Sequence, residues 1–128
     1  MDQIKYIKAE GTEGGGRELA SRYDAPVITV TVIYPKTAES HFDFGYYVDK
    51  HIPLVKARMA EFGLEDVKLM RGRAALVGGP PDFELIAQLT FNSPEHVKRA
   101  VMTHGAEILA DIPNFTNVQP HMQVNEHL

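Results

Sequence analysis

The sequence predicts a soluble α+β domain in which strands and helices follow one another in the order β-α-β-β-α-β. Two observations support this prediction: four short segments are rich in β-branched and aromatic residues, and two longer segments repeat apolar side chains at helical spacing. The chain has 128 residues, which suggests a single domain that can bury roughly two thirds of its unfolded surface. It contains no cysteine, so disulfides, thiolate catalysis and thiolate metal sites are excluded.

Two of the four expected strands give strong signals. Residues 27–34 spell VITVTVIY, a β-branched run that Pro35 closes. Residues 83–91 alternate apolar and polar side chains, which is typical of a strand with one buried face. Weaker patterns predict the other two strands over residues 67–76 and 116–124.

The first helix is expected over residues 42–62, with Ser40 and Asp43 as candidate caps. Pro53 lies inside it and lacks a backbone donor, so we expect a kink or a restart near His51. One face repeats apolar and aromatic side chains three or four residues apart, which predicts that this face packs on the sheet. That face consists of Tyr47, His51, Val55, Met59 and Phe62.

The second helix is expected to begin after Ser93 and to run to about Asp111. A serine cap, a proline in the first turn and an early acid, Glu95, are together typical of a helix start. Its inner face consists of Val97, Val101, His104 and Ile108.

The start of the chain differs from the rest in composition. Residues 1–26 are mostly polar, and residues 11–16 are too rich in glycine to hold a regular element. We therefore expect a flexible N-terminal arm, with a short helix near residues 17–22, followed by one folded domain over residues 27–126.

The element order is that of a ferredoxin-like fold with an antiparallel four-stranded sheet. Both helices are expected on the apolar face of the sheet, and the opposite face carries little charge for a face in water. This favours a homodimer in which a second sheet covers it; an unusually neutral solvated face is the alternative. Of the twelve side chains expected on that face, only Glu84 is charged. They are Val27, Thr29, Thr31, Ile33, Glu84, Ile86, Gln88, Thr90, Asn117, Gln119, His121 and Gln123.

Charge and hydropathy exclude other classes of protein. The formal net charge is −4, which opposes sequence-independent binding to nucleic acid. The uncovered sheet face also lacks the aromatic residues with which RNA-recognition domains of this strand order stack bases. No apolar run approaches the length of a membrane span, and no secretion signal is evident, so a cytoplasmic protein is expected.

Several motifs resemble the EthD family, small proteins associated with ethyl tert-butyl ether degradation that belong to the dimeric α+β barrel group. The resemblance covers about residues 27–126. It rests on the combination of motifs, since each alone would be unspecific. The motifs are Tyr34-Pro35, Phe42-Asp43, Tyr46-Tyr47, His51-x-Pro53-Leu54, Asp111 and Asn114-Phe115-Thr116.

The resemblance implies a homodimer whose two sheets form a barrel with the helices outside. It also implies a small apolar cavity between helices and sheet in each subunit. Relatives in the barrel group include cofactor-free monooxygenases, lactone isomerases and polyketide cyclases, and EthD proteins are often labelled oxidoreductases. No cofactor is therefore expected here.

His51 is the leading candidate for chemistry, because its helical face directs a neutral imidazole toward the sheet. Such a group could accept a proton from a phenol, an enol or the carbon next to a lactone carbonyl. Tyr47 lies one turn earlier on the same face and could orient a carbonyl. The alternative is a core histidine that satisfies backbone freed by Pro53, beside a tyrosine that is simply part of the core.

Three further residues are candidates for the same site. His104 would face His51 if both helices covered one cavity, although the family does not usually place a histidine there. Tyr34 and Phe115 are candidate walls of a substrate pocket, with core packing as the alternative. A metal site is not expected, because no pair of histidines has the helical spacing of a ligand motif.

These residues predict a cofactor-independent enzyme, of an oxidoreductase, monooxygenase or isomerase type, that acts on a small apolar, aromatic or lactone metabolite. His51 would be its general acid or base. The alternative is a non-catalytic protein that binds or carries a small molecule in the same pocket.

Overall fold

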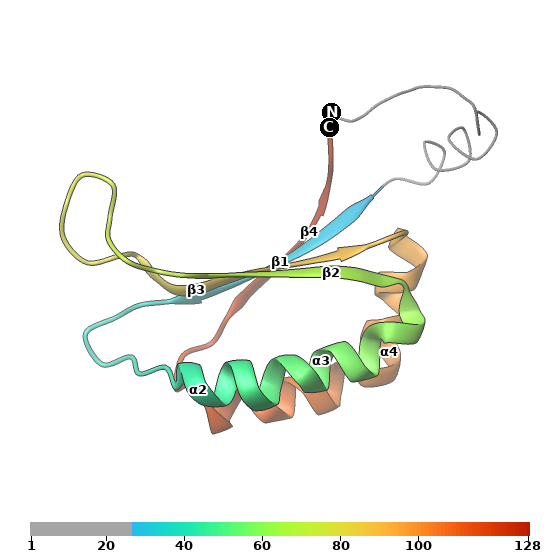
Figure 1. Ribbon diagram of the computed structural model, residues 1–128, viewed down its shortest axis with the longest axis horizontal. Helices are drawn as coiled ribbons and strands as arrows, with labels where there is room; N and C mark the ends of the chain where they lie inside the picture. The colour runs from blue at the N-terminus through green and yellow to red at the C-terminus, as the bar shows by residue number, and fades with distance from the viewer. Residues whose placement is uncertain (1–26) are drawn as a thin grey trace.

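The computed structural model describes residues 27–128, and the predicted arm with its short helix lies outside them. Strands β1, β2, β3 and β4 form one antiparallel sheet in the order β2-β3-β1-β4, and both helical segments lie on one face of it (Figure 1). The predicted ferredoxin-like α+β fold is confirmed. The elements are β1 (Ile28–Pro35), α2 (Phe44–Tyr46), η1 (Tyr47–His51), α3 (Ile52–Met59), η2 (Ala60–Phe62), β2 (Leu64–Arg71), β3 (Phe83–Phe91), α4 (Pro94–Asp111), η3 (Ile112–Asn114) and β4 (His121–Glu126).

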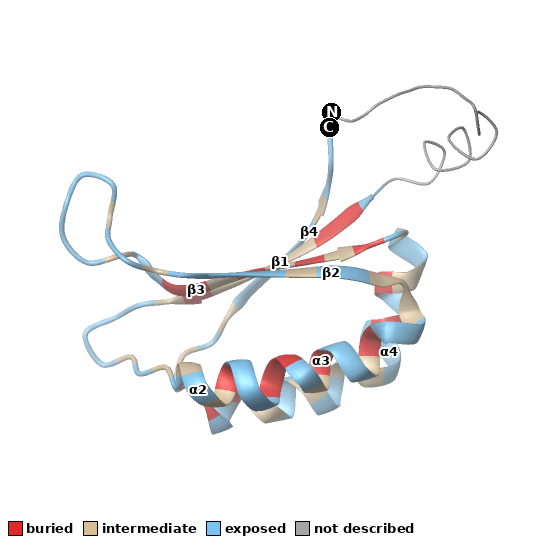
Figure 2. Ribbon diagram, viewed as in Figure 1, coloured by how far each residue is buried: buried red, intermediate tan, exposed pale blue. Residues whose placement is uncertain are grey.

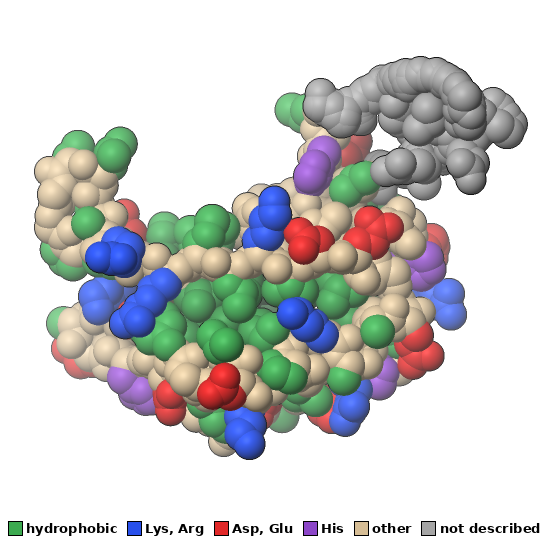
Figure 3. Space-filling model, in the orientation of Figure 1, with side chains coloured by type: hydrophobic (Ala, Val, Ile, Leu, Met, Phe, Trp, Pro, Cys, Tyr) green, Lys and Arg blue, Asp and Glu red, His purple; other side chains and the backbone are tan. Residues whose placement is uncertain are grey.

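The core lies between the sheet and the helices. Val30 of β1 pairs with Leu89 of β3 and with Val124 of β4, so alternate residues of neighbouring strands share the helix-facing side. Buried residues are concentrated on the surfaces where sheet and helices meet (Figure 2). Along the β2 side, hydrophobic side chains reach the molecular surface (Figure 3). Val48 of η1 and Leu69 of β2 are among the exposed hydrophobic residues.

The first helix is interrupted as expected. The Ile52 amide donates to the Tyr47 carbonyl, five residues back, and residues 47–51 form a π-helical turn directly before Pro53. Proline cannot donate the next helical hydrogen bond, so the ladder is rearranged at this point. Asp43 caps the helix by accepting from the Tyr46 amide, and Ser40 is not its cap.

Two strands differ from their predicted bounds. β2 was predicted over residues 67–76, but it extends from Leu64 to Arg71. It begins early because Gly63 ends the preceding helix with a left-handed φ of 81° and the chain turns at once into the sheet. β4 begins only at His121, where residues 116–124 were predicted. Pro120 has no amide for a ladder, and the Asn117 side chain instead binds backbone of the loop before α2.

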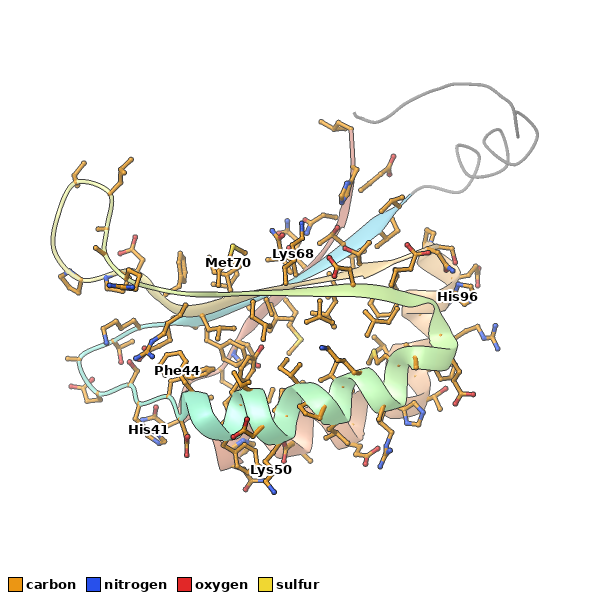
Figure 4. All side chains as sticks on the ribbon, in the orientation of Figure 1. His41, Phe44, Lys50, Lys68, Met70 and His96 are labelled. Atoms are coloured by element: carbon orange, nitrogen blue, oxygen red, sulfur yellow. The ribbon has the colours of Figure 1, made fainter. Side chains whose placement is uncertain are left out.

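These bounds change the composition of the sheet face opposite the helices. Asn117 and Gln119 precede β4, so they do not belong to this face as predicted. Glu84 is buried at its edge, where its carboxylate accepts from the Ser40 hydroxyl at 2.8 Å. β2 adds Asp66, Lys68 and Met70, which pair with Thr90, Gln88 and Ile86. The side chains of Lys68 and Met70 project away from the helices in Figure 4. The face therefore carries Asp66 and Lys68 in addition to Glu84, the one charged residue predicted there.

None of the helices within residues 27–128 is long and apolar enough to cross a membrane.

Two glycines with similar backbone angles allow a test of how the turn into β2 is stabilised. Gly63 has φ 81° and Gly79 has φ 89°, but only at Gly63 would a Cβ overlap neighbouring side chains, those of Asn92 and His96. We expect Gly79→Ala to cost about 1 kcal/mol from backbone strain and Gly63→Ala about 2–3 kcal/mol, because it adds crowding. Urea unfolding of both variants measures the difference, and equal losses would contradict this account.

Candidate functional site

A cavity of about 140 Å³ lies in the apolar layer between sheet and helices. Strands β1 and β3 form its floor and α3 and α4 its roof, with Met122 contributed by β4. Its lining is almost entirely hydrophobic. Among its lining residues, Tyr34, Tyr47 and His51 are the ones whose side chains contain nitrogen or oxygen.

His51 is buried at the cavity wall, with its relative exposure reduced to 3%. Its Nδ1 lies 2.9 Å from Oδ2 of Asp111, the last residue of α4. A carboxylate only accepts hydrogen bonds, so Nδ1 carries the proton and donates it. In the neutral imidazole Nε2 is then the unprotonated nitrogen, and it is the one left for a molecule in the cavity.

The Asp111 carboxylate is held by three donors. Besides His51, the Tyr46 hydroxyl donates to Oδ1 at 2.7 Å and the Asn114 side-chain amide donates to Oδ1 at 2.9 Å. Burial raises the pKa of Asp111, but the hydrogen bonds from His51, Tyr46 and Asn114 outweigh it and leave the pKa below the ordinary aspartate value. Asp111 is therefore ionised near neutral pH and can stabilise a protonated His51.

Aromatic rings fix the orientation of the imidazole. Tyr47 stacks on His51 with 5.5 Å between ring centroids and 21° between planes, and Phe115 lies 4.6 Å away on a tilted plane. Both aromatic residues are almost fully buried. The π-helical turn contains Tyr47 and His51 as its first and last residues, and it directs both toward the core.

The hydroxyls of Tyr34 and Tyr47 belong to buried rings that line the cavity. Burial raises the pKa of both phenols far above neutrality, so both hydroxyls stay protonated and can donate hydrogen bonds. Neither forms a hydrogen bond with another side chain of residues 27–128, whereas the Tyr46 hydroxyl does. Because buried polar groups are normally satisfied, these two hydroxyls favour a bound water or ligand in the cavity.

The structure brings Tyr34, Tyr47 and His51 to one cavity, but it places the other two predicted site residues elsewhere. Phe115 packs behind His51 and does not line the cavity. His104 does not face His51. It contacts the Phe62 ring with 5.7 Å between centroids and lies 3.8 Å from Glu107, because its side of α4 is turned toward η2.

The residues that hold His51 were not among the predicted site residues. Tyr46 belongs to the Tyr46-Tyr47 motif, and its hydroxyl binds the carboxylate that orients His51. Asp111 and Asn114 belong to the motif near the end of the second helix, but no spacing rule could pair them with His51, since Asp111 is 60 residues away in the chain. The sequence did indicate a connection in one way, because Asp111 and Asn114 belong to the same set of EthD motifs as His51.

Across residues 27–128, no three His, Asp or Glu side chains are grouped closely enough to hold a metal ion.

Comparison with known families and structures identifies the chain. The model of the EthD domain matches residues 36–119. The protein belongs to the EthD family. None of the curated proteins with which the chain was compared matches it.

Two solved structures are similar over most of the EthD chain. An EthD-like protein from Ralstonia eutropha JMP134 is 38% identical, with a TM-score of 0.75 and coverage of 80% of this chain and 92% of the other. An ethyl tert-butyl ether degradation (EthD) family protein from Bacillus halodurans C-125 is 19% identical, with a TM-score of 0.63 and coverage of 80% and 99%. The second likeness supports the fold alone.

The contribution of Asp111 to stability is expected to depend on pH. Its pKa is lowered by folding, so its stabilisation is fully present above the unfolded value, about 3.9, and is lost as pH falls below it. We expect Asp111→Asn to lower the free energy of unfolding by about 1–2 kcal/mol at about pH 6, with a smaller difference at about pH 3. Urea unfolding at both pH values measures this.

The exposed Asp49 provides a matched control on the first helical segment. Asp49→Asn is expected to leave the free energy of unfolding nearly unchanged at both pH values. A loss at Asp111 that is the same at both pH values would contradict a role for the ionised carboxylate.

Proposed function

We propose that this EthD protein binds a small, largely apolar metabolite in the cavity and catalyses proton transfer on it without a bound cofactor. His51 is the general acid and base, and Tyr34 and Tyr47 donate hydrogen bonds to an oxygen of the substrate. The observation that carries this proposal is the hydrogen bond of 2.9 Å from His51 to Asp111 at the wall of an otherwise apolar cavity.

The proposed step begins with transfer of a proton from a carbon next to a carbonyl to Nε2 of His51. The electron pair of the broken C–H bond moves onto the carbonyl oxygen and forms an enolate. The charge on the imidazolium is stabilised by Asp111, and the charge on the oxygen by the phenol hydroxyls. Return of the proton to a different carbon gives an isomer and restores neutral His51.

A lactone isomerisation is complete after these two proton transfers and consumes no other reactant, so it is the simplest reaction that the site supports. A phenolic substrate would lose its proton to His51 and form a phenolate. Reaction of that phenolate with dioxygen would place one oxygen atom on the ring as a quinone carbonyl and release the other as water. In both versions His51 accepts the first proton, from carbon in the lactone and from oxygen in the phenol, and only the second version consumes dioxygen.

A non-catalytic carrier is the alternative function. The nearly uniform apolar lining supports it, because binding of an apolar molecule needs no proton transfer. In that case His51 would act only as a hydrogen-bonding partner of the ligand.

The catalytic proposal is tested with α-angelica lactone, a one-ring lactone whose double bond shifts after proton abstraction. We expect the protein to accelerate the shift, followed by proton NMR, and His51→Gln to reduce the rate by about 10²–10⁴-fold. Gln replaces a buried side chain with one of similar size, so the fold should be retained; circular dichroism verifies this. A dioxygen electrode with a phenolic substrate tests the oxidative version.

His104→Gln is the matched control, because His104 lies outside the cavity. Its rate should remain close to that of the unmodified protein. If His51→Gln retains the full rate, the assignment of His51 as acid and base is wrong. Saturable lactone binding without turnover in the unmodified protein would instead favour the carrier.

We further propose that the protein is a homodimer in which the sheet faces opposite the helices pack together. The face is formed mainly by short polar and aliphatic side chains, and its central residue Gln88 pairs with Thr31 on β1 and Lys68 on β2. Most of its side chains are uncharged, and burial of an uncharged side chain costs less hydration than burial of a charged one.

The dimer is tested by placing a charge at the centre of the face. Gln88→Arg should convert a dimer into a monomer in light scattering, because it would bury a second cation directly opposite Lys68. Gln119→Arg introduces the same charge at an exposed position outside the sheet and should remain dimeric. A monomeric unmodified protein, or a dimeric Gln88→Arg variant, would exclude this interface.

A further inference from the structure

The cavity is open along one side, between α4 and β4. Three of its lining residues are about half exposed: Val101 at 57%, Leu109 at 50% and Met122 at 49%. The first two lie on α4 and the third on β4, whereas Tyr34, Tyr47 and His51 form the buried wall. A molecule that enters from this side therefore meets apolar side chains first and the polar groups last.

Gly105 lies at the centre of this open side. Val101, Gly105 and Leu109 follow one another at four-residue spacing, so they form one edge of α4 along the opening. A glycine inside a helix is unfavourable compared with alanine, because it adds backbone freedom to the unfolded chain. Its presence in an 18-residue helix calls for a physical reason.

Neither backbone geometry nor close packing supplies that reason. Gly63, Gly78 and Gly79 have left-handed φ angles, but Gly105 does not. At Gly72 an added Cβ would overlap the Phe83 backbone, whereas at Gly105 it would meet only the Val101 side chain of the same helix, at 3.3 Å. No strand or other helix approaches Gly105 closely enough to exclude a side chain, so the space beside it belongs to the opening of the cavity.

We propose that Gly105 determines specificity by keeping the entrance of the cavity open, and that the ligand is a one-ring molecule with an oxygen directed at Tyr34, Tyr47 and His51. This proposal rests on the proposed function of the same cavity as a small-molecule site. The volume of about 140 Å³ supports the ligand size, because an apolar cavity of about 150 Å³ engineered in another protein holds benzene.

The position of the polar groups sets the orientation of the ligand. The buried wall offers two phenol donors and Nε2 of His51, which suit a hydroxyl or a carbonyl oxygen. The open side offers Val101, Leu109 and Met122, which suit the apolar part. A side chain at position 105 would occupy the space through which that apolar part passes or projects.

The test uses phenol and 1-naphthol as one-ring and two-ring probes, with binding followed by two-dimensional NMR of the amide signals. We expect phenol to bind the unmodified protein saturably and Gly105→Leu to weaken this binding by about tenfold or more, because the isobutyl group fills the entrance. Gly105→Ala should bind phenol but lower the affinity for 1-naphthol relative to phenol.

Ala106→Leu is the matched control, because Ala106 is exposed on the same helix and does not line the cavity. It should bind phenol with the affinity of the unmodified protein. The proposal is overturned if phenol does not bind the unmodified protein, if Gly105→Leu binds phenol unchanged, or if Ala106→Leu weakens binding to the same extent. Unchanged relative affinity for 1-naphthol in Gly105→Ala would also count against it.

The proposed function fails in a different way. If His51→Gln leaves lactone turnover unchanged while Gly105→Leu loses phenol, His51 is not the base but the entrance is assigned correctly. Loss of turnover in His51→Gln with phenol binding unchanged in Gly105→Leu would leave the chemistry in place and refute the entrance.

Discussion

The hydrogen bond between His51 and Asp111 connects the first helical segment of this EthD protein to the C-terminal end of α4. It determines that Nδ1 of the imidazole carries the proton. It also places a carboxylate beside a histidine that is 60 residues away in the chain, which requires the folded structure. Tyr46 and Asn114 complete the carboxylate's hydrogen bonds, while Tyr47 and Phe115 hold the ring. The site therefore depends on the correct meeting of two segments that are far apart in sequence.

The π-helical turn at residues 47–51 shows how local sequence supports this meeting. Pro53 interrupts the hydrogen-bond ladder, and the extra residue in the turn changes the direction of the side chains on either side of it. Tyr47 and His51 share the buried face that helical spacing predicts, and Val55 and Met59 beyond the turn remain buried as well. This break would weaken an isolated helix, but here the segments on both sides of it are stabilised by packing against the core.

Local patterns predicted much of this arrangement. The bounds of β3, the cap at Ser93 and the buried face through Tyr47 and His51 follow from residues that are near one another in the chain. The start of β4 was missed because the side chain of Asn117 forms its hydrogen bonds with a loop almost 80 residues away. His104 was misplaced for a related reason: helical spacing defines a face, but only tertiary packing decides whether that face meets the cavity or Phe62.

Asp111 also occupies an electrostatically unfavourable position. It is the last residue of α4, where the aligned peptide dipoles leave a partial negative charge and where a cationic side chain would be favoured by about 0.3–1 kcal/mol. A carboxylate at this end is opposed by the field of its own helix. The donors around it outweigh both that field and burial, because the pKa of Asp111 is still lowered. The orientation of His51 therefore depends on Tyr46 and Asn114 remaining in place beside the carboxylate.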